Sequence, residues 1–522
     1  MASATTSPSY LRIVIEALTR YPNRIALVAG DRRLTYAQSA DLVSRLQQVL
    51  YDRGVRDGAT MVALSPNAPE VYLAQVAAGL NGACYTGLHA LGSVEDHAAL
   101  CDDAAATVLL VHPTYAATAA AIAAQAPSLQ TVLTLGPADY GEDLLALADL
   151  KSSAPLRAPL ASPQDAVWMP YTGGTTGRAK GVIHTHQSMI QGLLGISAAW
   201  QLPDTPRYLA CAPITHASVL PVLPTLARGG TVTLMSKFDP SVWRDTIVRE
   251  RINYGFIVPT MLYALLDMAD GHRLDELTSL ATIVYGSAPM SATRLTEALD
   301  VFGPILAQGY GQTETLGLGT VLRKDEHDPV NRPDLLTSCG RPIPGTQIEL
   351  LDDLGHPVDD GTVGELCMQA GFVMQGYWNQ PDLTDETLRD GWLHTGDLAV
   401  RDEQGHLHLV DRQKDLIISG AFNIYPREIE EVLAAQPDVS AVAVIGVPDE
   451  KWGEAVTAII VPRPGAVLDT EQLRLTVRER KGPHQAPKQI HLVESLPTTP
   501  VGKIDKRALR ATYWTGRGRA VN

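Results

Sequence analysis

Short runs of β-branched and apolar residues alternate with helical stretches from the N-terminus to about Val410, and this alternation is the strongest constraint on the fold. The strand-like runs include 166–171, 208–214, 231–235, 254–259 and 281–286. Strands that alternate with helices are typical of α/β domains, in which helices cover a mostly parallel sheet. Ligands of such sheets bind where the strands end, so functional residues are expected there.

The sequence changes character after Val410. The polar segment DRQKDLI at 411–417 leads to a helical stretch that Pro426 opens and whose first turns hold three glutamates, as is typical of helix starts. Two apolar runs and a basic tail follow. We therefore expect an α/β fold with a large multi-subdomain N-terminal body at 1–410 and a small α+β C-terminal domain at 416–522. The length of the body leaves room for about three subdomains.

Composition excludes several classes of function. The chain has 522 residues, and 42 Lys and Arg against 57 Asp and Glu give a net charge of −15. This excess of acid argues against nucleic acid or an anionic membrane surface as the main partner, because both repel negative charge. Apolar residues make up 45% of the chain, which is enough for several buried cores. A large acidic globular enzyme is the leading expectation.

The cysteines lie far apart, form no CxxC pair and have no histidine pair nearby at ligand spacing: Cys84, Cys101, Cys211, Cys339 and Cys367. This pattern indicates reduced cysteines, and neither a disulfide framework nor a zinc site. No basic leader precedes an apolar block at the N-terminus, and no window approaches the ~18 apolar residues of a membrane helix. We expect a cytoplasmic protein without a membrane span.

The segment YTGGTTGRAKG at 171–181 has the composition of a polyphosphate-binding loop. Glycine lets the backbone approach an anion and aim its N–H groups at it, while threonine hydroxyls and a lysine add donors and charge. The residues concerned are Thr172, Gly173, Gly174, Thr175, Thr176, Gly177 and Lys180. Gly181 follows Lys180 where a Walker A loop requires Ser or Thr. A flexible Gly/Thr linker is the alternative from composition alone.

This segment closely resembles the YTSGTTGxPKG signature of the AMP-forming adenylating superfamily, which includes acyl-CoA synthetases, peptide-synthetase adenylation domains and luciferases. Further motifs of that family follow in its order: YGSAP at 285–289, YGQTE at 310–314, TGD at 395–397, DRQKDLI at 411–417 and Gly-Lys at 502–503. The resemblance runs from about Arg24 to the end of the chain. Among members of that family, the sequence most resembles bacterial members of the fatty-acid–CoA-ligase type.

The resemblance implies that an acid and MgATP form an acyl-adenylate and pyrophosphate, after which the acyl group passes to CoA. Tyr310 would stack on adenine, Asp397 and Arg412 would hold the ribose, and Glu314 would bind Mg²⁺, a cation that prefers oxygen ligands. The other implied ATP-binding residues are the loop residues named above, Gly286, Ser287, Ala288, Pro289, Gly311, Gln312, Thr313 and Lys503.

Three residues are implied in catalysis. Lys503 would bridge the α-phosphate and the attacking carboxylate, Thr172 would act from the phosphate loop, and His216 in PITHAS would lie beside the acyl pocket. A satisfied core histidine is the alternative for His216. We expect His184 and His186 simply to lie where a helix starts.

The resemblance also implies that the C-terminal domain is a mobile lid that turns about a hinge at 411–415, with Lys414 as the hinge residue. After adenylation Lys503 would leave the site. The loop with Ser419, Gly420 and Ala421 would then enter and open a channel for the acceptor.

The sequence departs from the family pattern at three positions. Gly173 replaces the usual Ser and Ala179 the usual Pro, but the remaining threonines preserve the prediction of ATP binding. Ala421 stands where SGG is common, and alanine disfavours positive φ. Either the extra methyl group is accommodated, which we favour, or transfer to CoA is impaired.

An acid–CoA ligase that uses ATP, Mg²⁺ and CoA is the first hypothesis. The second is an adenylating enzyme with another acceptor, a carrier-protein thiol or an amine, including chemistry that activates nitrite for diazotisation. A non-enzymatic binding protein is a poor third. The sequence does not separate fatty from aromatic acids, and it leaves the oligomeric state open, a homodimer included.

Overall fold

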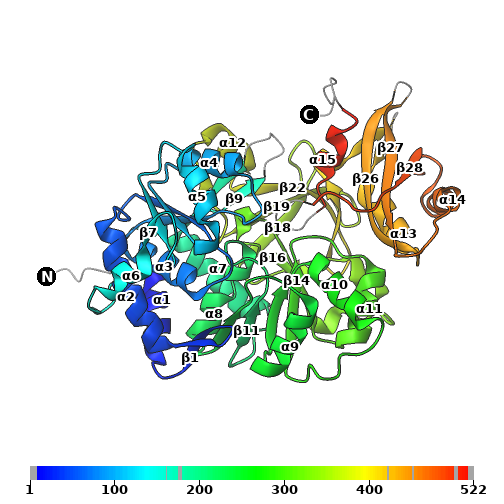
Figure 1. Cartoon of the computed structure of the whole chain (residues 1–522). Coiled ribbons are helices and arrows are strands. Elements are labelled where there is room, and N and C mark those ends of the chain that lie inside the picture. The colour runs from blue at the N-terminus through cyan, green and yellow to red at the C-terminus, as the bar shows by residue number, and fades with distance from the viewer. Residues whose placement is uncertain are drawn as a thin grey trace.

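The computed structural model describes residues 9–159, 161–173, 179–419, 422–449, 452–498 and 504–514. The strands of these residues form four sheets, three in a large N-terminal body and one in a small C-terminal domain (Figure 1). The predicted class, a mixed α/β body followed by a small α+β domain, is confirmed.

The first sheet of the body carries a central set of parallel strands. In spatial order it contains β17 (Arg341–Pro342), β16 (Gly319–Leu322), β15 (Leu306–Gly311), β14 (Thr282–Gly286), β13 (Tyr254–Ile257), β11 (Arg207–Ala210), β12 (Thr231–Leu234), β1 (Ile25–Ala29) and β2 (Arg32–Thr35). The strands from β15 to β1 run parallel. β14 and β15 end at the predicted adenine and YGQTE segments, as expected for a ligand site at strand ends.

The second sheet holds the strand that carries Lys180. Its order is β20 (Gly376–Tyr377), β10 (Ala179–Thr185), β8 (Ala166–Trp168), β4 (Cys84–Gly87), β3 (Thr60–Leu64), β5 (Val108–Val111), β6 (Thr131–Thr134) and β7 (Glu142–Asp143), and β9 (Tyr171–Gly173) pairs with β10. The single strand expected at 166–171 is therefore two strands. Pro170 lies between them and has no N–H group with which to continue a ladder.

The third sheet is antiparallel and connects the body to the C-terminal domain. It consists of β18 (Thr346–Leu351), β19 (Gly364–Ala370), β22 (Trp392–Arg401), β21 (Leu388–Arg389) and β23 (Leu407–Arg412). The fourth sheet contains β25 (Phe422–Ile424), β24 (Ile417–Ser419), β27 (Gly453–Pro462), β26 (Val439–Asp449) and β28 (Gln489–Leu492). The C-terminal domain has a core of its own, whose buried members lie between Ile417 and Val477.

Helices cover the sheets of the body and lie on both sides of the fourth sheet (Figure 1). They are α1 (Tyr10–Arg20), α2 (Tyr36–Asp52), α3 (Pro69–Leu80), α4 (Val94–Asp103), α5 (Ala116–Ala123), α6 (Leu144–Asp149), α7 (His186–Ala199), α8 (Val222–Ala227), α9 (Pro240–Glu250), α10 (Pro259–Ala269), α11 (Ala292–Phe302), α12 (Pro381–Thr387), α13 (Pro426–Ala434), α14 (Thr470–Lys481) and α15 (Lys506–Ala511). Short 3₁₀ turns include η2 (Ala217–Val219), η3 (Thr313–Thr315) and η6 (Gln413–Asp415). Pro426 is at the first position of α13, as its sequence predicts.

Candidate active site

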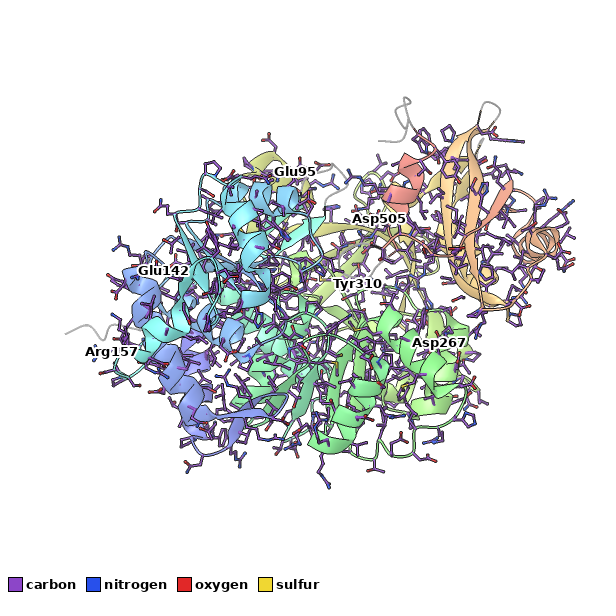
Figure 2. All side chains as sticks on the ribbon, in the orientation of Figure 1. Glu95, Glu142, Arg157, Asp267, Tyr310 and Asp505 are labelled. Carbon is purple, nitrogen blue, oxygen red and sulfur yellow. The ribbon has the colours of Figure 1, made fainter. Side chains whose placement is uncertain are left out.

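A cleft of about 2650 Å³ lies between the body and the C-terminal domain. Figure 2 shows Tyr310 near the centre of the molecule and Asp505 in the C-terminal domain, and both residues line this cleft. The cleft brings together many of the predicted site residues: Thr172, Lys180, His216, Ser287, Ala288, Pro289, Tyr310, Gly311, Gln312, Thr313, Glu314, Asp397, Arg412 and Lys414. Gly174, Thr175, Thr176, Gly177, Gly420, Ala421 and Lys503 lie outside the described residues.

The Asp397 carboxylate is the meeting point of three predicted motifs. Its Oδ2 accepts hydrogen bonds from the Tyr310 hydroxyl at 2.7 Å and from Gln312 Nε2 at 2.8 Å. Its Oδ1 lies 2.9 Å from Arg412 Nε. Asp397 is only 4% exposed, so these charged contacts are shielded from water and are stronger than surface pairs. Burial, together with this carboxylate, raises the pKa of the Tyr310 phenol well above its ordinary value, so the phenol keeps the proton it donates.

Strand pairing explains this convergence. Asp397 in β22 and Arg412 in β23 are direct partners in an antiparallel ladder. Gln312, which follows β15, also donates from Nε2 to the Thr395 carbonyl oxygen at 2.8 Å, which ties the first sheet to the third. The YGQTE and TGD motifs, 85 positions apart at Gln312 and Asp397, thus form one polar cluster.

The segment after β14 is shaped by close backbone packing. A Cβ atom at Gly286 would lie 2.3 Å from the Gly309 carbonyl oxygen of the neighbouring strand, so only glycine fits there. Ser287 follows with φ of +69°, a conformation that L-residues rarely adopt. Tyr285 points into the core instead, and its hydroxyl lies 3.0 Å from His327 Nε2.

Glu314 is held by a tyrosine that lies outside the predicted motifs. The Tyr377 hydroxyl donates to Glu314 Oε1 at 2.7 Å, and the Met374 N–H donates to the Glu314 carbonyl oxygen at 2.7 Å. Tyr377 lies in β20, which pairs with the strand of Lys180, and Lys180 Nζ is 5.4 Å from the centre of the Tyr377 ring. Tyr377 therefore connects the strand of Lys180 with Glu314. No sequence motif marks it, because its role depends on the pairing of distant strands.

Thr172 and Lys180 lie opposite each other in the β9–β10 ladder, so both ends of the glycine-rich loop are anchored at the cleft. The expectation that both histidines lie where a helix starts is confirmed for His186, the first residue of α7, and is wrong for His184, which lies in β10. His184 is fully buried, stacks on Trp168, and its Nε2 lies 2.8 Å from the Thr313 carbonyl oxygen. Burial lowers the pKa of His184 to about 4, so the ring is neutral and donates this hydrogen bond. This hydrogen bond positions Thr313, the residue that precedes Glu314.

His216 lines the cleft on the side of the second sheet's β4. Its Nδ1 is 2.9 Å from the Thr215 hydroxyl oxygen, and its ring meets that of His89 edge to face at 5.3 Å. Burial lowers the pKa of His89 to about 4, so this neighbour adds no positive charge. Apolar and aromatic side chains also line this cleft: Ala217, Leu220, Pro259, Tyr263, Met290 and Leu316.

The predicted hinge segment faces the same cleft. Arg412 ends β23 and directly precedes η6, which contains Lys414; burial and the nearby Arg412 charge lower the pKa of Lys414. Two ion pairs hold α15 here, Arg510 to Asp415 at 2.8 Å and Lys506 to Glu430 at 2.7 Å.

The structure places Ser419 away from this arrangement. Ser419 is buried within β24. From the segment around it, Ile418 and Asn423 line the cleft. The start of the segment after Lys503 also lines the cleft, from Ile504 to Arg507. The predicted acceptor channel at 419–421 therefore remains a prediction.

Comparison with known proteins identifies the family of this chain. Residues 14–378 match the family described as AMP-binding enzyme, and residues 428–503 match the AMP-binding enzyme C-terminal domain. The chain belongs to the AMP-binding enzyme family, and the predicted AMP-forming ligase is confirmed at this level.

Three relatives are informative. The chain is 44% identical to a medium/long-chain-fatty-acid–CoA ligase, FadD8, of Mycobacterium tuberculosis, over 98% of this chain and 91% of that protein. It is 38% identical to a feruloyl-CoA synthase of Amycolatopsis sp, over 94% of this chain and 96% of that protein. Its fold is similar to that of the amide bond synthetase McbA of Marinactinospora thermotolerans, with a TM-score of 0.88, 34% identity and coverage of 97% and 99%. The curated relatives favour CoA over another acceptor.

Among the helices of the described residues, none is both long and apolar enough to cross a bilayer.

Proposed function

We propose that this protein activates an acid with an apolar body as its acyl-adenylate and transfers the acyl group to CoA. The observation that carries the proposal is the cluster around Asp397, which joins residues of the YGQTE, TGD and DRQKDLI motifs in one contact network. The apolar side chains that line the cleft suit an alkyl or aryl acid. The fatty-acid and feruloyl ligases among the relatives have names consistent with this substrate class.

In the first step a carboxylate oxygen attacks the α-phosphorus of ATP, and the bond to pyrophosphate breaks. Both reactants are anions, so positive charge and fixed geometry must offset their repulsion. We assign Lys180, Thr172 and the glycine-rich loop to the phosphates, and Lys503 to the meeting point of α-phosphate and carboxylate. The ribose would bind at Asp397 and Arg412, and adenine would lie between Tyr310 and the 286–289 segment.

Glu314 suits a magnesium ion bound together with ATP. Mg²⁺ is usually held by one or two carboxylates together with substrate phosphates, and Glu314 supplies one such carboxylate at the cleft. Tyr377 fixes that carboxylate by donating to Oε1. The ion would neutralise phosphate charge, while the residues of this chain orient it.

In the second step the CoA sulfur attacks the acyl carbonyl carbon, the thiol proton passes to solvent, and AMP leaves with the carboxylate-derived oxygen. We propose that the C-terminal domain at 416–522 turns about 411–415 between the steps, with Lys414 at the hinge and 419–421 beside the acceptor.

The five cysteines include four that are buried, and all are free thiols. Free thiols are usual in a reducing compartment, which supports a cytoplasmic location.

The test is pyrophosphate release from ATP over a panel of medium-chain fatty acids, aryl acids and nitrite, with and without CoA, followed by mass analysis of products. Acyl-CoA from an apolar acid supports the proposal. Because one similar structure is an amide bond synthetase, an amine is added in a parallel series. Amide formation without thioester from any acid would reject CoA as the acceptor.

A further inference from the structure

A thiol, an imidazole and a carboxylate converge on the third sheet, at the edge of the cleft. Cys367 in β19 and His394 in β22 are direct partners in the antiparallel ladder, and Glu365 precedes Cys367 by two positions on its strand. His394 Nδ1 lies 2.7 Å from Glu365 Oε2 and 3.3 Å from Cys367 Sγ. One ligand atom from each residue lies within 4.8 Å of the other two. Cys367 is fully buried, while Glu365 and His394 line the cleft.

No single protonation state of His394 satisfies the hydrogen-bonding groups around its Nδ1. The guanidinium of Arg389 also approaches His394 Nδ1, at 2.8 Å. A ring nitrogen offers either one N–H or one lone pair. If Nδ1 carries a proton, it donates to Glu365 but faces the N–H of Arg389. If Nδ1 carries a lone pair, it accepts from Arg389 but faces the carboxylate oxygen of Glu365. By contrast, a cation placed among the three groups would use the lone pairs of nitrogen, sulfur and oxygen together.

We propose that Glu365, Cys367 and His394 bind Zn²⁺ or a similar borderline-soft divalent cation, at a site separate from the magnesium site assigned to Glu314. Three protein ligands of these types with a water as the fourth are a normal zinc coordination set, whereas Mg²⁺ prefers oxygen alone. The ion enters from the cleft, which Glu365 and His394 line. On binding, the Cys367 thiol loses its proton to solvent, His394 coordinates through Nδ1, and Arg389 turns away.

Arg389 can move because its side chain is 52% exposed. The other oxygen of Glu365, Oε1, accepts the Gly396 N–H at 3.0 Å, and Asp397 follows Gly396. The ion would therefore be anchored to the strand that carries the proposed ribose ligand. The scattered cysteines indicated no zinc site because Cys367 and His394 are 27 positions apart and meet only through strand register.

Titration of the full-length protein with Co²⁺, followed by absorption spectroscopy, tests the proposal without measuring activity. Cobalt replaces zinc in such sites, and a thiolate ligand gives a charge-transfer band in the near ultraviolet. We expect the band in the native protein, its displacement by added Zn²⁺, and its absence in Cys367→Ala. Cys101→Ala is the matched control, because Cys101 is also a buried free cysteine but lies in α4 and packs in a separate core, and it should keep the band.

Two further variants keep the test decisive if Cys367→Ala does not fold. Glu365→Gln should weaken cobalt affinity at least roughly tenfold, since loss even of groups that only orient metal ligands costs about 10–100-fold. Arg389→Gln should instead tighten it roughly fivefold, because a positive charge close to the ion is removed. Absence of a thiolate band in the native protein, its persistence in Cys367→Ala, or weaker binding by Arg389→Gln would each overturn the proposal.

Discussion

Asp397 and Arg412 face each other across the β22–β23 ladder, and their side chains are joined at 2.9 Å between Oδ1 and Nε. Arg412 is also the residue immediately before η6, the turn that contains Lys414. The proposed ribose site and the proposed hinge at 411–415 therefore share Arg412. A nucleotide bound at Asp397 would contact the same short segment that carries the C-terminal domain.

Asp397→Asn should lower kcat/KM for ATP about 10- to 150-fold, which corresponds to loss of a charged hydrogen bond of about 1.5–3 kcal/mol. The amide cannot pair with Arg412 as an anion does. Steady-state kinetics with varied ATP measure the effect. Asp325→Asn is the control, because Asp325 pairs with Arg323 on the surface and should leave kcat/KM unchanged. Equal kinetics for the two variants would remove Asp397 from the ATP site.

Tyr377→Phe should raise the Mg²⁺ concentration needed for half-maximal rate about tenfold, because a hydrogen bond to a charged group is lost and Glu314 is no longer held. High Mg²⁺ should restore much of the rate. The measurement is initial rate against free Mg²⁺ at saturating ATP. Tyr140→Phe, at an exposed tyrosine outside the cleft, should behave as the native protein does. An unchanged Mg²⁺ dependence in Tyr377→Phe would contradict the assignment of Glu314.

Gly286→Ala should cost about 1–3 kcal/mol of unfolding free energy and weaken ATP binding, because the added Cβ would collide with the Gly309 carbonyl oxygen. Denaturant unfolding and ATP titration measure the two effects. Gly255→Ala provides a close control: Gly255 lies on the neighbouring strand β13, and a Cβ there meets nothing within 4 Å. If both glycines tolerate alanine equally, backbone contact at Gly286 does not shape the site.

His184 makes stability depend on pH in a predictable direction. Its pKa is about 4 in the folded protein and has an ordinary value of 6.5, so the unfolded chain binds more protons between these values. The unfolding free energy should therefore fall as pH drops from 6.5 to 4, by up to about 3 kcal/mol. His184→Gln retains a donor toward Thr313 but does not titrate, and its stability should fall less over this range. Parallel pH profiles of the native protein and the variant would disprove this role.

The alternation of strand-like and helical runs predicted the fold class, and the motifs predicted that Tyr310, Asp397 and Arg412 belong to one site. They did so because each motif is a continuous segment whose residue types reflect its contacts. Tyr377, His184 and the Cys367–His394 pair were not predicted, since each acts through the register of strands that lie far apart in sequence. Conversely, Pro170 could have divided the 166–171 run, because a residue without an N–H group is a local signal.

Oxygen transfer from acid to AMP tests the central claim most directly. The enzyme is supplied with ATP, CoA and an apolar acid labelled with ¹⁸O in its carboxylate, and AMP and pyrophosphate are analysed by mass spectrometry. An acyl-adenylate requires one labelled oxygen in the AMP formed with each thioester and none in pyrophosphate. Thioester formation with unlabelled AMP would contradict the account, because the carboxylate could not then have attacked the α-phosphorus.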